Sequence, residues 1–176
     1  MIELDVARIR ELLAELDTRL VERGIEAKLF IVGGAAMALA YNARRTTMDI
    51  DGVFVPRDVV LDAAQEVADA HQLPKHWLSD GVVQLMPLHE DDHPRSETIG
   101  RALVIEIASP EYLLAMKAMS SRQSDGDLED AALLCKQLAI TKESAIDEVV
   151  ARYFGSGVVG AQELFFERII DRAARH

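Results

Sequence analysis

The first third of the chain carries two distinct hydrophobic patterns. Apolar residues recur at helical spacing over residues 3–23, and Gly24 follows as a stop signal. Residues 28–32 form a short apolar run that ends at Gly33-Gly34, which predicts a buried strand. Small apolar residues over 35–41 predict a short helix that begins directly after the glycines.

The middle of the chain repeats this pattern, and the last third is helical. Residues 48–55 predict a second strand, with Ile50 and Val53 facing the core, and residues 57–71 have helical spacing. The stretch up to Gly100 contains several prolines and predicts one short strand at 82–86, before a third clear strand at 102–108. After Ser109-Pro110 we expect helices at 111–121, 127–139, 142–153 and 161–175.

This order of elements predicts the fold class. Strands and helices come first and helices dominate the end, so we expect an α/β (α+β) fold, a mixed sheet flanked by helices with a helical C-terminal part. We expect one domain over residues 1–140, with the helix at 3–23 packed on it, and a helical extension over 141–176.

Composition narrows the classes of partner. The 176 residues carry a net charge of −11 without a sustained basic run, which disfavours a protein that holds duplex DNA by neutralising phosphates. The single cysteine excludes a disulfide framework and Cys-rich zinc sites. The start of the sequence lacks the apolar core of a signal peptide, and no apolar run approaches the roughly 20 residues that span a bilayer. We therefore expect a cytoplasmic protein without a membrane partner.

The strongest candidate chemistry lies in the first two strands. Gly33-Gly34 lets a ligand approach the backbone and leaves unpaired N–H groups at the start of a helix, where phosphate can bind, although such a pair is also a common tight turn. Asp49 and Asp51 stand two positions apart, so on one strand both carboxylates project from the same face. Two such carboxylates suit Mg²⁺ or Mn²⁺, and the alternative is a solvated acidic strand face. The glycine turn upstream favours the metal interpretation.

These motifs together resemble the nucleotidyltransferase (polymerase-β-like) fold. The segment VGGAAMALAYNARRTTMDIDGVF is similar to the minimal nucleotidyltransferases grouped with AbiEii-type toxins of bacterial toxin–antitoxin systems. The later segment SPEYLLAMKAMSSRQSDGDLEDAALL resembles the second signature of that group, so the resemblance covers roughly residues 28–140. It departs from the pattern at Gly34-Ala35, because many transferases of this fold have Ser after the first Gly, and that hydroxyl contact with phosphate is missing here.

The resemblance implies roles for individual residues. It implies that Asp49 and Asp51 are catalytic and hold the divalent metal, and that Lys117 contacts the triphosphate or the reacting groups. The residues that it implies for nucleotide binding are Gly33, Gly34, Arg45, Thr47, Asp127 and Asp130.

Several of these residues have ordinary structural alternatives. Lys117 lies on an apolar helix, from which a lone lysine can extend its amine to the solvent. Asp127 followed by Asp130 suits a helix N-cap and its first turn, and Arg45 with its neighbour Arg44 suits a surface pair as well as a phosphate clamp.

Glu106 interrupts the apolar strand at 102–108. A buried, unpaired carboxylate is costly, so either that face of the strand is open or Glu106 has a cationic partner. The fold commonly places a third carboxylate on such a strand, as a base or third metal ligand, and the alternative is an exposed edge position.

These observations predict a metal-dependent nucleotidyltransferase that moves a nucleoside monophosphate from an NTP to an acceptor hydroxyl, with Mg²⁺ or Mn²⁺ as cofactor. The resemblance implies a toxin that acts on tRNA and is restrained by an antitoxin protein. Two alternative functions stay open. One is a binding partner of weak catalytic power in a regulatory pair, and the other is a transferase that modifies a small molecule such as an antibiotic. A protein hydroxyl also stays open as the acceptor.

Overall fold

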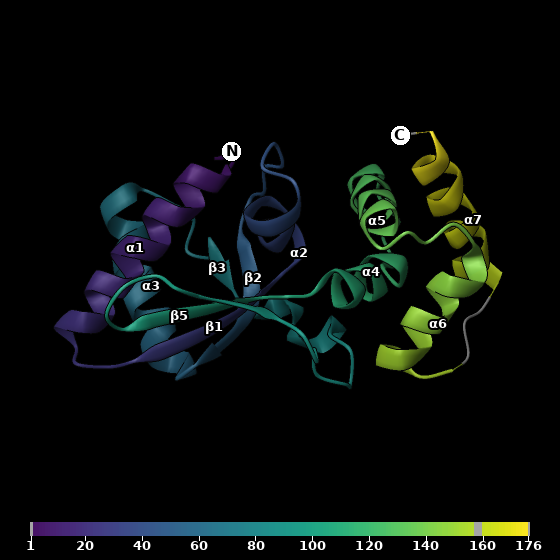
Figure 1. Cartoon of the computed structure of the whole chain (residues 1–176). Helices are drawn as coiled ribbons and strands as arrows, with labels where there is room; N and C mark the ends of the chain where they lie inside the picture. The colour runs from purple at the N-terminus through teal and green to yellow at the C-terminus, as the bar shows by residue number, and fades with distance from the viewer. Residues whose placement is uncertain (1, 157–159, 176) are drawn as a thin grey trace. The chain divides into compact units, whose positions relative to one another are not determined.

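A computed structural model describes residues 2–156 and 160–175, and the chain divides into two compact units (Figure 1). The first unit contains residues 1–84 and 94–108, and the second contains 85–93 and 109–176. The domain boundary predicted after residue 140 does not coincide with the boundary between these two units, and it stays a prediction. In the part of the chain that the structure describes, no helix is long and apolar enough to cross a membrane.

The first unit is built on a five-stranded sheet in the order β3-β2-β1-β5-β4. The central strand β1 pairs antiparallel with β2 and parallel with β5, while β3 runs parallel to β2 and β4 antiparallel to β5. The strands are β1 (Ala27–Val32), β2 (Ile50–Val55), β3 (Leu78–Ser79), β4 (Arg95–Thr98) and β5 (Leu103–Ile107).

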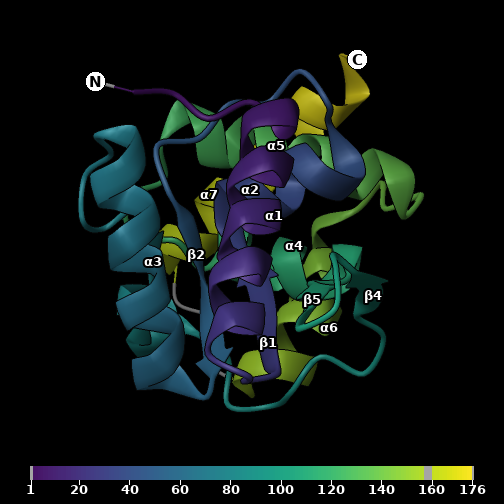
Figure 2. The ribbon, with the colours of Figure 1, turned by 90° about the vertical axis from the view of Figure 1, so that its left-hand side faces the viewer.

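Two amphipathic helices cover one face of this sheet. The helices α1 (Val6–Glu22) and α3 (Arg57–His71) contact each other and lie side by side in front of the strands (Figure 2). The burial of alternate residues shows which face they cover, since Leu29, Ile31 and Phe54 are buried. The opposite face carries Asp51 and Glu106, which are half-buried.

The chain turns sharply between β1 and β2. The short helix α2 (Gly33–Ala36) begins where β1 ends and continues as one π-helical turn, Met37–Tyr41. The N–H of Asn42 donates to the Met37 carbonyl at 2.7 Å, and the Tyr41 hydroxyl donates to the Ala108 carbonyl at 2.7 Å. These bonds hold the turn at the end of the sheet where β1 and β5 finish.

The second unit is helical. Its helices are α4 (Pro110–Ala118), α5 (Asp125–Gln137), α6 (Glu143–Phe154) and α7 (Gly160–Ala174). α4 contacts both α5 and α6, and the rings of Tyr112 and Tyr153 meet edge to face with centroids 5.2 Å apart. Burial raises the pKa of Tyr112 to about 12, so its hydroxyl stays neutral in this core.

The fold class expected from the sequence is confirmed, and several local expectations are wrong. The segment predicted as a strand at 82–86 is a 3₁₀ turn, Gly81–Leu85, because the Ser79 hydroxyl and the Asp80 carbonyl accept the N–H groups of Gly81 and Val83. Val53 lies on the same face of β2 as Asp51 rather than opposite it, since strand side chains alternate. The short strands β3 and β4 were not predicted.

Candidate functional site

The end of β1 brings the glycine turn against one of the predicted carboxylates. Val32, the last residue of β1, pairs with Asp51 of β2, so Gly33 follows directly beside the Asp51 side chain. A Cβ placed on Gly33 would lie 3.7 Å from Asp51 Oδ2, and Gly33 has a φ of +65°, which glycine adopts readily. The structure thus brings Gly33 and Asp51 together, as the sequence motif predicts.

Gly34 is fitted against a different side chain. A Cβ placed on Gly34 would lie only 2.7 Å from Thr47 Oγ1 and 3.0 Å from Thr47 Cβ. The Thr47 hydroxyl donates to the Asp49 carbonyl at 3.1 Å. Gly34, Thr47 and Asp49 therefore form one contiguous structure beside Asp51.

The expectation that both aspartates lie on the strand is wrong for Asp49. β2 begins at Ile50, whose N–H donates to the Trp77 carbonyl at 2.7 Å, and Asp49 lies in the bend that precedes it. The strand begins there because β3 supplies the ladder partner from Ile50 onward. Both aspartates are half-buried.

A tight turn leads into this bend. The N–H of Arg45 donates to the Asn42 carbonyl at 2.9 Å, and the N–H of Arg44 donates to Asn42 Oδ1 at 3.1 Å. Arg44 is exposed and Arg45 half-buried. The two arginines are therefore unlike in burial, and the role of Arg45 in nucleotide binding stays a prediction.

Glu106 has the cationic partner that the sequence left as one of two alternatives. Its carboxylate lies 2.6 Å from Lys28 Nζ, and β5 is an inner strand, so the alternative of an exposed edge position is wrong. Glu106 of β5 pairs with Phe30 of β1, whereas Asp51 of β2 pairs with Val32, two residues further along β1. The two carboxylates therefore lie on strands on opposite sides of β1. With strands about 4.8 Å apart and a rise of about 3.3 Å per residue, their Cα atoms are about 12 Å apart. The register does not bring Glu106 to Asp51, and its role as base or metal ligand stays a prediction.

The predicted residues of the second signature meet in a buried cluster within the second unit. Lys117 Nζ lies 3.0 Å from Asp127 Oδ1 and 2.9 Å from Asp130 Oδ2, and all three residues are buried. The alternative of a lysine that extends to the solvent is therefore wrong. The expectation of Asp127 as the cap and Asp130 in the first turn is wrong, because Ser124 caps α5, which places Asp127 in the first turn and Asp130 beyond it.

The charges of this cluster compensate one another. Burial alone raises the pKa of Asp127, but the Lys117 charge and the hydrogen bonds from Lys117, Ser124 and Ser120 outweigh it and hold that pKa below its usual value. Two serine hydroxyls reach Asp127 Oδ2, at 2.8 Å from Ser124 and 3.0 Å from Ser120. The sequence did not indicate these serines as partners of Asp127.

The sequence reasoning also missed two residues beside Asp51. Ser79 of β3 pairs with Asp51 in register, so both side chains leave the sheet on the same face. Gly52 follows Asp51, and a Cβ there would lie 2.1 Å from the Phe30 carbonyl oxygen, so only glycine permits this pairing of β1 with β2. A glycine inside a strand is a recognisable signal of such a close approach.

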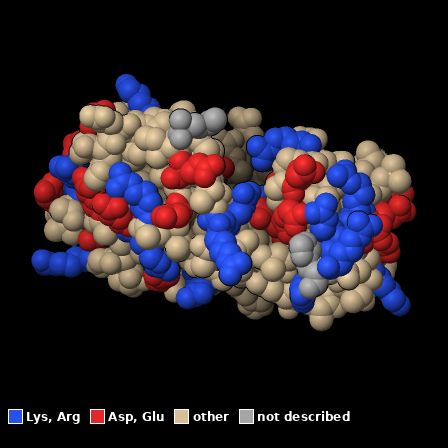
Figure 3. Space-filling model, turned by 90° about the horizontal axis from the view of Figure 1, so that it is seen from above, with Lys and Arg blue, Asp and Glu red and all other residues tan. Residues whose placement is uncertain are grey.

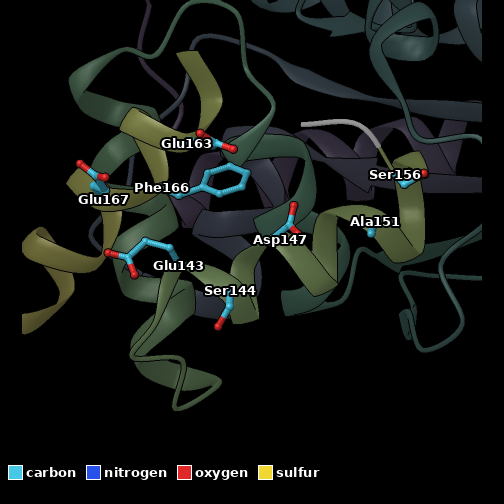
Figure 4. Close-up of a pocket in the computed structure, with 8 residues that line it drawn as sticks. All are labelled: Glu143, Ser144, Asp147, Ala151, Ser156, Glu163, Phe166 and Glu167. Carbon is cyan, nitrogen blue, oxygen red and sulfur yellow. The ribbon is translucent and has the colours of Figure 1, made fainter. Parts of the chain in front are cut away.

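The second unit also contains an acidic hollow between α6 and α7 (Figure 4). Its carboxylates surround the Phe166 ring, and none of its lining residues is among those predicted for the site. The lining residues are Glu143, Ser144, Asp147, Ala151, Ser156, Glu163, Phe166 and Glu167.

Asp49 and Asp51, near the glycine turn, suit a cation whose other ligands are water and substrate phosphates. Within the described residues, no group of three or more His, Cys, Asp or Glu side chains is placed to hold a metal ion. Mg²⁺ commonly binds through only one or two carboxylates, with water and substrate phosphates completing its shell. Asp49 and Asp51 are of the right chemistry and number for this kind of site.

Comparison with known proteins gives the family of the chain. No curated protein and no solved structure matches the chain. The family model described as "Nucleotidyltransferase of unknown function (DUF6036)" matches residues 7–155, which include the glycine turn, both aspartates and the Lys117 cluster. The chain belongs to this nucleotidyltransferase family.

Proposed function

We propose that this chain is a metal-dependent nucleotidyltransferase that moves a nucleoside monophosphate from an NTP to an acceptor hydroxyl. The observation that carries the proposal is the placement of the Asp51 carboxylate directly beside the Gly33-Gly34 turn at the end of β1. This placement sets a carboxylate next to backbone N–H groups that begin a helix and have no partner within it. Family membership supports the same reaction class.

In this proposal, each group near the turn has a separate task. The N–H groups of Gly33 and Gly34 donate to oxygens of the triphosphate. Asp49 and Asp51 hold Mg²⁺ or Mn²⁺, which when bound supplies positive charge to the triphosphate. Arg45 enters as a further nucleotide contact on the strength of the resemblance, which implies the same role for Thr47.

The reaction itself needs little covalent chemistry from the protein. The acceptor hydroxyl attacks the α-phosphorus, the bond from that phosphorus to the bridging oxygen breaks, and pyrophosphate leaves. The chain contributes by positioning the phosphates and by stabilising the charge that develops on them. The roles of Lys117, Asp127 and Asp130 in this reaction, and that of Glu106 as its base, enter the proposal from the resemblance alone.

The resemblance to AbiEii-type toxins leads to a finer proposal about the acceptor. We propose a tRNA end as acceptor and an antitoxin protein as a partner that restrains the activity. Within each unit, Lys and Arg lie among Asp and Glu on the side seen in Figure 3. The net charge of −11 repels an extended phosphate backbone, which favours a small RNA footprint over a long one in this proposal.

Label transfer tests the reaction and its acceptor together. Each α-labelled NTP is incubated with the protein and Mg²⁺ or Mn²⁺, in separate reactions that contain total RNA, total protein or a panel of small cationic molecules. We expect label in tRNA and none from the Asp49→Asn/Asp51→Asn variant. Asp62→Asn/Asp69→Asn is the matched control, since it removes the same charge from exposed positions of α3.

The outcomes separate the candidate functions. Label in a small molecule replaces the tRNA proposal with the small-molecule transferase. Absence of transfer in every reaction, together with metal-dependent NTP binding, favours the binding partner of weak catalytic power. Absence of both transfer and NTP binding rejects the proposed function.

A further inference from the structure

The Thr47 hydroxyl donates a hydrogen bond to the peptide group that joins Asp49 to Ile50. Thr47 Oγ1 donates to the Asp49 carbonyl at 3.1 Å, and the next N–H, that of Ile50, donates to the Trp77 carbonyl at 2.7 Å. A threonine hydroxyl has a single proton to donate. While that proton is donated to Asp49, it is not available to a phosphate oxygen, which can only accept.

The Thr47 side chain also packs against the glycine turn, at Gly34. The position of a Cβ on Gly34 would be 2.7 Å from Thr47 Oγ1 and 3.0 Å from Thr47 Cβ, so the Gly34 backbone packs directly on the threonine. The requirement for glycine at position 34 is therefore explained by Thr47 itself. Phosphate is not needed to explain it.

The backbone of Thr47 is fixed independently of its side chain. Its N–H donates to the Leu4 carbonyl at 3.0 Å, and its carbonyl accepts from the Leu4 N–H at 2.7 Å. Leu4 is 1% exposed, so this attachment is itself anchored in the core. Thr47 thus has a rigid base from which its side chain reaches Asp49 on one side and Gly34 on the other.

We propose that Thr47 is a positioning residue that orients the Asp49–Ile50 peptide and supports Gly34, and that it is not a nucleotide contact. This inference rests on the proposed function in so far as Asp49 is a metal ligand. The positioning itself follows from contacts within the first unit. It replaces the nucleotide-binding role that the family resemblance implies for Thr47.

Two substitutions separate the hydroxyl from the shape of the side chain. Thr47→Val keeps the branched shape against Gly34 and loses the O–H donor, whereas Thr47→Ser keeps the donor and loses the methyl group. The net contribution of one hydrogen bond, about 1 kcal/mol, corresponds to about a fivefold change in an equilibrium constant. We expect Thr47→Val to weaken Mn²⁺ binding about fivefold, measured from the signal of free Mn²⁺ by electron paramagnetic resonance. Thr47→Ser is expected to stay within about twofold of the original protein.

A second readout needs no metal. Amide hydrogen exchange of the peptide over residues 48–54 is expected to be several-fold faster in Thr47→Val than in Thr47→Ser or the original protein. Unchanged exchange and unchanged Mn²⁺ binding in Thr47→Val would overturn the inference. Loss of NTP affinity in Thr47→Val but not in Thr47→Ser, with exchange and Mn²⁺ binding unchanged in both, would also overturn it and restore the nucleotide contact of the hydroxyl.

The design distinguishes this inference from the proposed function. If the original protein binds no Mn²⁺, or if Asp49→Asn/Asp51→Asn binds it equally well, the proposed metal site is rejected, while hydrogen exchange still decides the positioning role. Circular dichroism and thermal unfolding verify that each variant folds. If Thr47→Val does not fold, the comparison of Thr47→Ala with Thr47→Ser provides the same test.

Discussion

Two glycines of the first unit differ in what surrounds them, and this difference predicts different energetic consequences. At Gly24 an added Cβ meets nothing within 4 Å, so only the positive φ of +66° opposes a side chain. At Gly52 the added Cβ would lie 2.1 Å from the Phe30 carbonyl oxygen. That atom belongs to the backbone of the adjacent strand and cannot move without opening the β1–β2 ladder.

The first prediction compares Gly52→Ala with Gly24→Ala. The left-handed conformation costs a non-glycine residue about 1 kcal/mol, which we expect for Gly24→Ala. We expect Gly52→Ala to lower the free energy of unfolding by more than about 3 kcal/mol, because overpacking against backbone cannot relax. Urea unfolding of both variants measures the difference, and equal losses would show that the strands tolerate the clash. Both changes are Gly→Ala, so their effects on the unfolded chain are alike.

The second prediction concerns the buried ammonium of Lys117. Lys117→Met leaves the Asp127 and Asp130 carboxylates buried without their cation, and breaking such a pair costs about 3–5 kcal/mol. Lys75→Met, at an exposed position, is the control and is expected to change the unfolding free energy by less than about 0.5 kcal/mol. Urea unfolding at pH 7 measures both.

The pH dependence of this variant has a definite sign. In the original protein the pKa of Asp127 is lower folded than unfolded, so the ion pair stabilises the fold above the usual carboxyl pKa and this stabilisation is lost as the pH falls through the folded value. Without Lys117, burial raises the pKa of Asp127, and protonation of this carboxylate reduces the destabilisation of the variant. We therefore expect the stability gap between the two proteins to narrow from pH 7 to pH 4. A gap that is constant with pH would contradict the ion-pair explanation.

At the scale of elements, one carboxylate ties α1 to the start of β5. The buried side chain of Asp17 accepts the N–H groups of Ala102 at 2.8 Å and Leu103 at 2.7 Å, with Arg101 at 3.3 Å. Gly100 makes room for it, since a Cβ there would lie 2.1 Å from Asp17 Oδ2. The helix thereby accepts the N–H groups of the two residues before β5 and of its first residue, Leu103.

The third prediction is that Asp17→Ala destabilises the protein by about 2–4 kcal/mol, because it leaves buried N–H groups without an acceptor. Asp62→Ala, on an exposed face of α3, is the control and should stay within about 0.5 kcal/mol. Thermal and urea unfolding measure the change. A loss for Asp17→Ala no larger than that of the control would show that water replaces the carboxylate.

The elements also show how far the sequence can be interpreted on its own. α3 has the predicted bounds because an amphipathic repeat over 57–71 is a local signal. β4 has no apolar alternation, since its residues Arg-Ser-Glu-Thr form a strand only by pairing with β5, and that pairing is a tertiary contact. The same limit applies at the site. Local motifs indicated Gly33 and Asp51, whereas the register Val32↔Asp51 and the contacts Thr47–Asp49 and Lys28–Glu106 depend on how the chain folds back.

At the scale of the whole molecule, the net charge affects stability, so a substitution that changes it at the site can alter stability as well as metal binding. The net charge of −11 disfavours the compact state through repulsion between like charges. Replacing two aspartates by asparagine changes this charge to −9, by the arithmetic −11 + 2, and this alone alters stability. A variant of the site is therefore interpretable only beside one that removes the same charge elsewhere.

The fourth prediction uses the stability of the whole chain to detect ligand binding. A ligand that binds only the native state at about 100 times its Kd adds about 2.7 kcal/mol to the unfolding free energy. For a chain of this length that corresponds to a rise in Tm of about 5 °C or more. We expect this rise with NTP and Mg²⁺ together, and a smaller one with either alone, because the cation needs the phosphates as ligands. Asp49→Asn/Asp51→Asn should lose the rise, whereas the charge-matched Asp62→Asn/Asp69→Asn should retain it. If both variants respond like the original protein, the NTP binds elsewhere and the assignment of the metal ligands is wrong.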